Sequence, residues 1–236
     1  MRFQLACVLT ALLASSALAR PRVVLDPGHG GSNLGAEGGP PGLREKHLTL
    51  ILANEVAARL RERGIEVTLT RTADRTLTLR QRVEIANTLP ADVFVSIHAN
   101  ASPTRSQRGY ETYVLTARGL DIDARALRSE AMTPRPGVDR ETALVLDDVE
   151  RGAAQWDSAE LAARMQKSLE ARRGADGNRG VRQDSQHVLL GATMPAVLVE
   201  VGFIDHPLEG KELAQERVQA QLADAIAEAI EDQLAE

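Results

Sequence analysis

The sequence is poor in cysteine and in aromatic residues. It has one cysteine, Cys7, among its 236 residues, and aromatic side chains make up 3% of the chain. A disulfide framework is excluded, so stability must come from a buried core, to which a metal can add. The formal net charge is −5, and no basic patch with interleaved aromatics is present. Nucleic acid and attachment to an anionic surface by charge alone are therefore disfavoured as targets.

The first nineteen residues have the pattern of a secretory signal peptide. One basic residue precedes the apolar run Leu5–Leu13, which is too short to span a bilayer, and Ala17–Ala19 forms a small-x-small cleavage site. Cys7 lies inside the apolar run, which argues against a lipid anchor there. We therefore expect cleavage near Ala19/Arg20 and a periplasmic or secreted chain with no membrane anchor.

Short apolar runs alternate with segments of helical period along the rest of the chain. This pattern predicts one α/β domain over residues 20–236, with a mixed or parallel sheet and helices on both faces. The expected strands are Arg22–Asp26, Ile65–Thr70, Asp92–Ile97, Gly109–Thr116, Val188–Leu190 and Ala196–Val201. The expected helices are Glu45–Arg63, Leu79–Leu89, Ser158–Arg173 (with Ser158 as its N-cap) and Glu209–Glu236.

Two segments depart from this alternation. Residues 27–42 form a loop rich in glycine and proline, as expected beside a bound ligand. Residues 121–152 are charged, contain two prolines and show no clean period, so they are predicted to form a surface insert with a short helix at Glu141–Glu150. Residues 175–186 are interpreted as a polar loop.

Three strands deliver a chemically active side chain. His29 and His98 follow apolar runs, and Glu200 lies inside a third, where an unpaired carboxylate is expensive to bury. Open α/β sheets bind ligands at the carboxyl ends of their strands. Catalytic zinc takes three histidine or carboxylate ligands and leaves one position open, and Glu45, at a helix N-terminus, is the candidate third ligand.

Each of these residues has a simpler reading when taken alone. A histidine after a strand is often structural, and an acidic residue in a first helical turn is ordinary capping. The remaining histidines, His47, His187 and His206, are left out of the predicted ligand set, with His206 the best candidate among them to line its rim.

Taken together, these stretches resemble the zinc-dependent N-acetylmuramoyl-L-alanine amidases of the type 3 family, which are bacterial cell-wall hydrolases. The resemblance covers most of the chain after residue 19. It is carried by Leu25–Gly31 (LDPGHGG), Arg44–Lys46 (REK), Leu69–Arg71 (LTR), Ala86-Asn87, Ser96–Asn100 (SIHAN), Gly109–Tyr113 (GYETY) and Pro195–Phe203 (PAVLVEVGF).

The resemblance implies a six-stranded central sheet and a site for Zn²⁺. His29, Glu45 and His98 would be the metal ligands and Glu200 the catalytic carboxylate. The substrate would be peptidoglycan, cleaved at the amide between N-acetylmuramic acid and the L-alanine of the stem peptide. We expect a monomer with no separate cofactor-binding residues.

The resemblance also suggests how the activity is regulated, and the sequence departs from the family pattern at two points. Some relatives are held inactive by a helix over the zinc, carried in an insert at the position of residues 121–152. The acidic candidates for such a cap here are Glu141, Asp147, Asp148 and Glu150; a solvated surface helix is the alternative reading. Gln186-His187 stand where relatives often have an aromatic residue, and no separate targeting module is visible, so recruitment to the wall falls to the domain or to a partner such as an activator protein.

Two other functions remain open on the sequence. A zinc carboxypeptidase that trims stem peptides also uses two histidines and a glutamate, but its first pair has His-x-x-Glu spacing, unlike His29 and Glu45. A non-catalytic peptidoglycan-binding module on the same fold would have lost part of the metal set, whereas all four positions are filled here.

Overall fold

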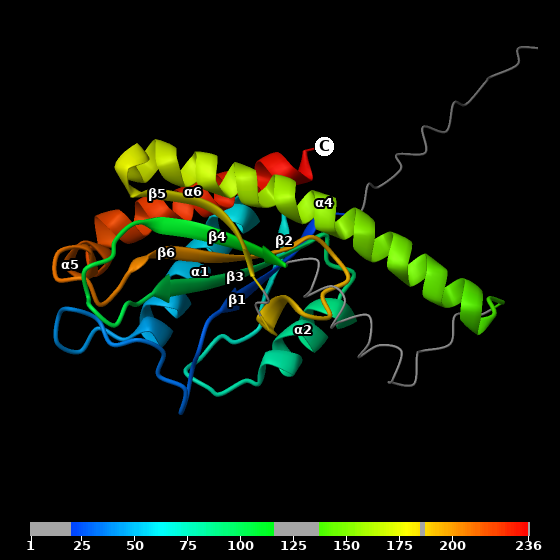
Figure 1. The fold of residues 1–236 in the computed structure, drawn as a ribbon, viewed down its shortest axis with the longest axis horizontal. Coiled ribbons are helices and arrows are strands. Elements are labelled where there is room, and N and C mark those ends of the chain that lie inside the picture. Colours follow the sequence, from blue (N-terminus) through cyan, green and yellow to red (C-terminus); the bar gives the residue numbers. More distant parts are fainter. Residues whose placement is uncertain (1–19, 116–136, 185–186, 236) are drawn as a thin grey trace, which may run out of the picture.

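A six-stranded sheet forms the centre of the molecule (Figure 1). The computed structural model describes residues 20–115, 137–184 and 187–235. The strand order is β2-β1-β3-β6-β4-β5, and β4 runs antiparallel to β6 while the other neighbouring pairs are parallel. The strands are β1 (Arg22–Pro27), β2 (Glu66–Leu69), β3 (Val93–Asn100), β4 (Tyr110–Leu115), β5 (Asn178–Asp184) and β6 (Ala196–Phe203). The predicted α/β fold with a mixed sheet is confirmed.

Helices cover both faces of this sheet. They are α1 (Glu45–Glu62), α2 (Leu79–Thr88), α4 (Arg140–Arg173), α5 (Glu209–Leu213) and α6 (Glu216–Leu234), with short 3-10 turns η1 (Ala175–Gly177) and η2 (His187–Leu189). One large apolar cluster joins α1, α4 and α6 to one face, and a smaller cluster joins α2 and η2 to the other. Figure 1 shows α4 and α6 on one side of the sheet and α2 on the opposite side.

Alternation along the central strands decides where the polar residues point. In β3, Val93, Val95, Ile97 and Ala99 belong to the large cluster, whereas Phe94 belongs to the smaller one. Because successive side chains of a strand point to opposite faces, His98 lies on the face of Phe94. The same rule places Glu200 of β6 on the face of Leu198. Both polar residues therefore lie on the α2 face, near the carboxyl ends of their strands.

The sequence prediction failed at the outer edge of the sheet. Residues 178–184, expected in a loop, form β5, which pairs only with β4 and is polar because its other side has no strand partner among the described residues. The strand expected at Val188–Leu190 is absent; residues 188 and 189 belong to η2, and Leu190 lies in the turn that follows. An edge strand with polar side chains lacks the apolar run on which the prediction relied.

The two helices expected between residues 141 and 173 form one continuous helix, α4. Asp139 is its N-cap and accepts a hydrogen bond from the Thr142 backbone N–H. Ser158, predicted as an N-cap, lies in mid-helix, where its hydroxyl accepts from the backbone N–H of Ala196. The C-terminal segment, predicted as one helix, is divided into α5 and α6.

None of the helices in the described parts of the chain combines the length and apolar character needed to span a bilayer. The expected signal peptide, residues 1–19, lies outside the described residues, as do residues 121–136 of the predicted insert.

Candidate metal centre

His29 stands in the turn that follows β1. Its backbone has φ 60°, a left-handed conformation that is uncommon for a residue with a side chain, and it is followed by two glycines with positive φ. The ring Nδ1 lies 2.8 Å from Oδ1 of Asn33. An Nδ1–H that donates to this oxygen leaves the Nε2 lone pair free to bind a ligand.

Two buried arginines hold this turn in place. Arg82 donates from Nη2 to the carbonyl oxygen of His29 at 2.7 Å and pairs through Nη1 with Asp26 at 2.6 Å. Arg71 donates to the carbonyl oxygens of Pro27 and Gly28 at 2.9 and 2.8 Å. The strained turn is thus fixed through its own carbonyl groups. Sequence reasoning missed this role: Arg71 was noted only as part of the Leu69–Arg71 motif, and Arg82 belongs to no recognised pattern.

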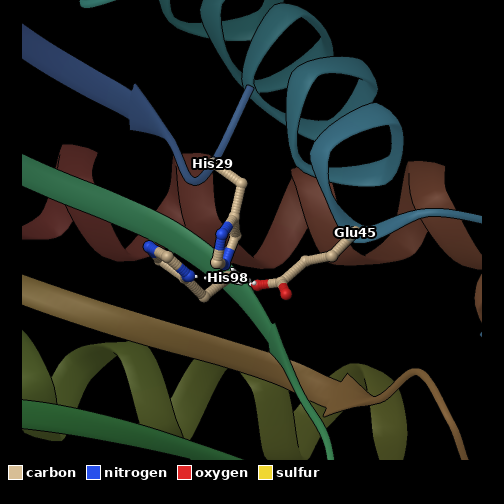
Figure 2. A group of neighbouring side chains, drawn as sticks. All are labelled: His29, Glu45 and His98. Atoms are coloured by element: carbon tan, nitrogen blue, oxygen red, sulfur yellow. Dashed lines mark hydrogen bonds and ion pairs between the residues drawn. The ribbon is translucent and has the colours of Figure 1, made fainter. Parts of the chain in front are cut away.

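Glu45 is the first residue of α1 and points from the helix end toward both histidines (Figure 2). Its Oε1 lies 3.0 Å from Nε2 of His29 and 3.0 Å from Nδ1 of His98. The other oxygen accepts from the backbone N–H of Ala36 at 2.8 Å. Burial opposes ionisation, but the hydrogen bonds to His29 and His98 outweigh it and hold the pKa of Glu45 well below its usual value.

Two glycines beside the cluster, Gly28 and Gly35, occupy positions where a larger side chain would collide with the histidine rings or the carboxylate. A Cβ on Gly28 would stand 2.4 Å from Cε1 of His98. A Cβ on Gly35, which has φ +65°, would stand 2.6 Å from Oε2 of Glu45 and 2.8 Å from the ring of His29. These glycines therefore leave space in which the three polar side chains converge.

The three predicted ligands form one cluster with the geometry of a metal site. One ligand atom from each of His29, Glu45 and His98 lies within 4.8 Å of the others, and the two rings stand edge to face with centroids 4.9 Å apart. Two neutral imidazole nitrogens and one carboxylate oxygen directed at one point are a suitable donor set for a divalent transition metal. The residues present fit such an ion.

Glu200 lies beside this cluster, one strand from His98. The two residues are register partners in the β3–β6 pair, and Oε2 of Glu200 is buried with no hydrogen-bond partner among the described residues. Burial, followed by the charges of Glu45 and Glu111, raises the pKa of Glu200 well above its usual value. A buried carboxyl group with a free oxygen next to a metal-ligand set has the placement of a proton carrier.

Glu111 is a further buried carboxylate that sequence reasoning did not single out. It opposes Glu200 in the β4–β6 pair and is 3% exposed. Asn100 Nδ2 and the hydroxyl of Tyr113 donate to its Oε1 at 2.8 and 3.0 Å. Its place in Gly109–Tyr113, opposite a strand that carries another glutamate, was the available signal.

Among the described side chains, the histidines left out of the ligand set, His47 and His206, do not join it. His47 is half exposed, with Nε2 3.8 Å from Asp74. The ring Nδ1 of His206, which was predicted to line the rim, accepts from the backbone N–H groups of Leu208 and Glu209 at the start of α5. The side chain of His187 lies outside the described part of the chain.

The helical part of the predicted insert lies at the far end of the sheet. Ser158 of α4 contacts Ala196, the first residue of β6, so the preceding turns extend beyond the amino end of that strand, away from the cluster (Figure 1). Residues 140–152 therefore do not cover the three ligands in this structure. The side chains of Glu141, Asp147, Asp148 and Glu150 lie outside the described ones, so no capping contact can be assigned to them.

The sequence profile described as N-acetylmuramoyl-L-alanine amidase matches residues 23–232, which include all four predicted site residues. The chain belongs to this family. Among relatives of the amidase, AmiA of Salmonella typhimurium is 35% identical over 216 residues, which cover 88% of this chain and 74% of the relative. AmiC of Neisseria meningitidis is 34% identical over 219 residues, covering 90% and 52%.

Solved structures of the family share the fold of this amidase. The catalytic domain of CwlV from Bacillus (Paenibacillus) polymyxa var. colistinus is 32% identical with a TM-score of 0.70, covering 91% of this chain and 98% of that domain. CwlD of Clostridioides difficile, solved in complex with the GerS lipoprotein, is 25% identical with a TM-score of 0.72, covering 92% and 99%. The sheet and its helices are thus those of the amidase family.

Proposed function

We propose that this chain is a zinc-dependent hydrolase of peptidoglycan. It would cleave the amide bond between N-acetylmuramic acid and the L-alanine of the stem peptide. The observation that carries this proposal is the convergence of His29, Glu45 and His98 beside the buried carboxyl of Glu200, in a chain of the amidase family.

Zinc suits the donor set better than magnesium or calcium, because those ions prefer oxygen ligands. Ligand atoms about 2.0–2.2 Å from a tetrahedral zinc lie roughly 3.3–3.6 Å from one another. Glu45 Oε1 is 3.0 Å from each histidine nitrogen, so small side-chain shifts accommodate the ion. Ala36 and Ala99 keep the carboxylate in place through their backbone N–H groups.

Each polar residue then has a separate task in amide hydrolysis. When bound, zinc supplies a Lewis acid that polarises the scissile carbonyl and lowers the pKa of water. His29, Glu45 and His98 hold the ion. Glu200 accepts a proton from the attacking water and delivers it to the amide nitrogen, so that L-alanine leaves as an amine; positioned acid–base catalysis of this kind accelerates reactions by about 10²–10⁴.

Export and control by a partner complete the proposal. Residues 1–19 would act as a signal peptide that directs residues 20–236 to the compartment of the substrate. An activator protein is consistent with the solved complex of CwlD with the GerS lipoprotein. The chain itself would act as a monomer.

Mass spectrometry of purified sacculi digested with the protein tests the proposed reaction. Release of intact stem peptides is expected, with loss of product in a chelator and recovery on addition of Zn²⁺. Loss only of a terminal D-alanine would identify a carboxypeptidase instead. Binding to sacculi without any released peptide, at full zinc occupancy, would identify a wall-binding module.

A further inference from the structure

A row of charged side chains extends from the metal cluster across the sheet to its edge. His98, Glu200 and Glu111 are register partners on β3, β6 and β4, and Tyr113, two residues after Glu111, is the register partner of Arg182 on β5. Register partners share a face of the sheet, so these side chains lie on the α2 face. The row begins with the predicted zinc ligands and ends with two arginines of the edge strand.

Glu111 anchors these arginines without neutralising both of them. Its Oε2 lies 2.9 Å from Nε of Arg179 and 3.4 Å from Nε of Arg182. One carboxylate thus faces two guanidinium groups, which leaves an excess of one positive charge at this end of the row. A charge excess of that sign favours an anionic group of a ligand.

The two arginines differ in how far their donors are already used. Arg179 also donates to the side chain of Gln107 at 3.0 Å and packs over the ring of Phe203, 4.9 Å from its centroid. Its guanidinium is therefore held in place by these contacts with neighbouring side chains. Arg182 has 49% of its side chain exposed; its Nε contacts Glu111, and its terminal nitrogens have no hydrogen-bond partner among the described residues. A free guanidinium edge is suited to bidentate binding of a carboxylate.

The distance along the row fits a peptide. Three strand spacings separate His98 on β3 from Arg182 on β5, and Arg182 lies two residues further along the strand direction, so the separation is roughly 16 Å at about 4.8 Å per strand and about 3.3 Å per residue. An extended peptide covers about 3.3–3.6 Å per residue, so this span takes about four to five residues, fewer by the reach of the Arg182 side chain. A substrate with its scissile amide at the cluster would bring one of the following residues to Arg182.

We propose that Arg182 is a specificity-determining residue that binds a free carboxylate of the stem peptide, with Glu111 and Arg179 as the residues that position it. This inference rests on the proposed function, because the stem peptide is the ligand of that function. It identifies the part of the substrate recognised beyond the scissile bond as an acidic residue.

Two muropeptides distinguish this role from a structural one. MurNAc-L-Ala-D-Glu-diaminopimelate is compared with the same compound carrying carboxamides in place of the free carboxylates of the peptide. Arg182→Gln should raise KM for the acidic compound about tenfold, the loss expected for one charge-assisted hydrogen bond, with kcat within twofold. The amidated compound should be hydrolysed equally by both proteins. Arg182→Lys keeps the charge but loses the planar guanidinium that can bind a carboxylate through two N–H groups. Its KM for the acidic compound should therefore lie between those of the wild type and Arg182→Gln.

A matched control and a binding measurement make the test independent of turnover. Arg217→Gln removes an arginine from α6, on the opposite face of the sheet, and should leave both KM values unchanged.

Calorimetry with Glu200→Gln should give a lower Kd for the acidic than for the amidated compound, and adding Arg182→Gln should abolish the difference. Equal Kd values for the two compounds in Glu200→Gln overturn the role of Arg182, whether or not the wild type cleaves either. If the difference is present but neither compound is hydrolysed, the amidase proposal fails and the carboxylate site stands.

Discussion

The ring of His98 lies directly on the backbone of Gly28, where a methyl group would stand 2.4 Å from Cε1 and 2.5 Å from Nε2. β1 and β3 are neighbours, and Gly28 continues β1 by donating its N–H to the carbonyl oxygen of Ile97 at 3.0 Å. This contact lets the histidine of one strand reach the turn that carries the histidine of the other.

Gly28→Ala should therefore damage the metal site more than the fold. The added methyl must displace the His98 ring, since the backbone on both sides is held by hydrogen bonds. We expect at least a tenfold loss of zinc affinity in a competition titration with a chromophoric chelator, with a native circular dichroism spectrum. Gly42→Ala is the control: Gly42 also has positive φ, but its Cβ would meet no atom within 4 Å. Equal zinc affinities in the two variants would contradict the argument.

His98→Ala removes one of the two nitrogen donors. We expect stoichiometric zinc to be lost after dialysis, as measured by atomic absorption, and the melting temperature of the zinc-loaded protein to fall toward that of the metal-free wild type. The reason is that a ligand that binds only the folded state stabilises it, and its three donors come from separate elements. A variant that retains one tightly bound zinc at an unchanged melting temperature would remove His98 from the ligand set.

Glu200→Gln separates the chemistry from metal binding. The amide keeps the shape of the side chain but cannot carry a proton, so kcat should fall at least about 100-fold while zinc content and fold are retained. Loss of zinc in this variant would make Glu200 a ligand and call the assignment of Glu45 into question. Near-full activity would make the buried carboxyl a structural residue.

The fold and the gathering of His29, His98 and Glu200 at one sheet edge could be predicted because their strands have local signatures, whereas Glu45 was chosen from its place at a helix N-terminus and from the family resemblance. β1, β3 and β6 are apolar on both faces, and a histidine or glutamate at such a strand is conspicuous against that background. β5 was not predictable, because an edge strand has no need of apolar residues on both faces. The mid-helix position of Ser158 depends on contact with Ala196, nearly forty residues away, which local capping rules cannot detect.

The supporting residues were less predictable than the ligands. Arg71 and Arg82 act by donating to backbone carbonyl groups, and any residue type can supply a carbonyl. Glu111 becomes significant only once β4 is known to run antiparallel beside β6. Such contacts depend on register and topology rather than on spacing along the chain.

Arg82→Met should weaken the site through the turn that carries His29. The substitution removes the hydrogen bond to the His29 carbonyl and leaves Asp26 without its ion-pair partner. We expect the melting temperature to fall, because an unpaired buried charge is costly, and zinc affinity to decrease about 10–100-fold, as for other residues that support ligands. Ser96→Ala is the control for the first effect, since it removes a 2.7 Å hydrogen bond to Asp26 without touching the turn. If both variants bind zinc as the wild type does, Arg82 stabilises the core and does not position His29.

The raised pKa of Glu200 predicts a pH-dependent gain in stability on its replacement. Burial keeps the carboxyl group protonated in the folded metal-free protein to a higher pH than in the unfolded chain. Between the two pKa values the folded state binds more protons, so wild-type stability decreases as pH rises through this window. Glu200→Gln does not titrate there, and each unit of pKa shift corresponds to about 1.4 kcal/mol.

In metal-free protein, the variant should melt near the wild-type temperature at about pH 4 and several degrees higher at pH 8. With zinc bound, the positive charge favours the carboxylate, and the difference at pH 8 should shrink. Melting curves of both proteins, with and without zinc, check this; a difference that is constant from pH 4 to pH 8 in the metal-free proteins would show that Glu200 titrates normally in the fold.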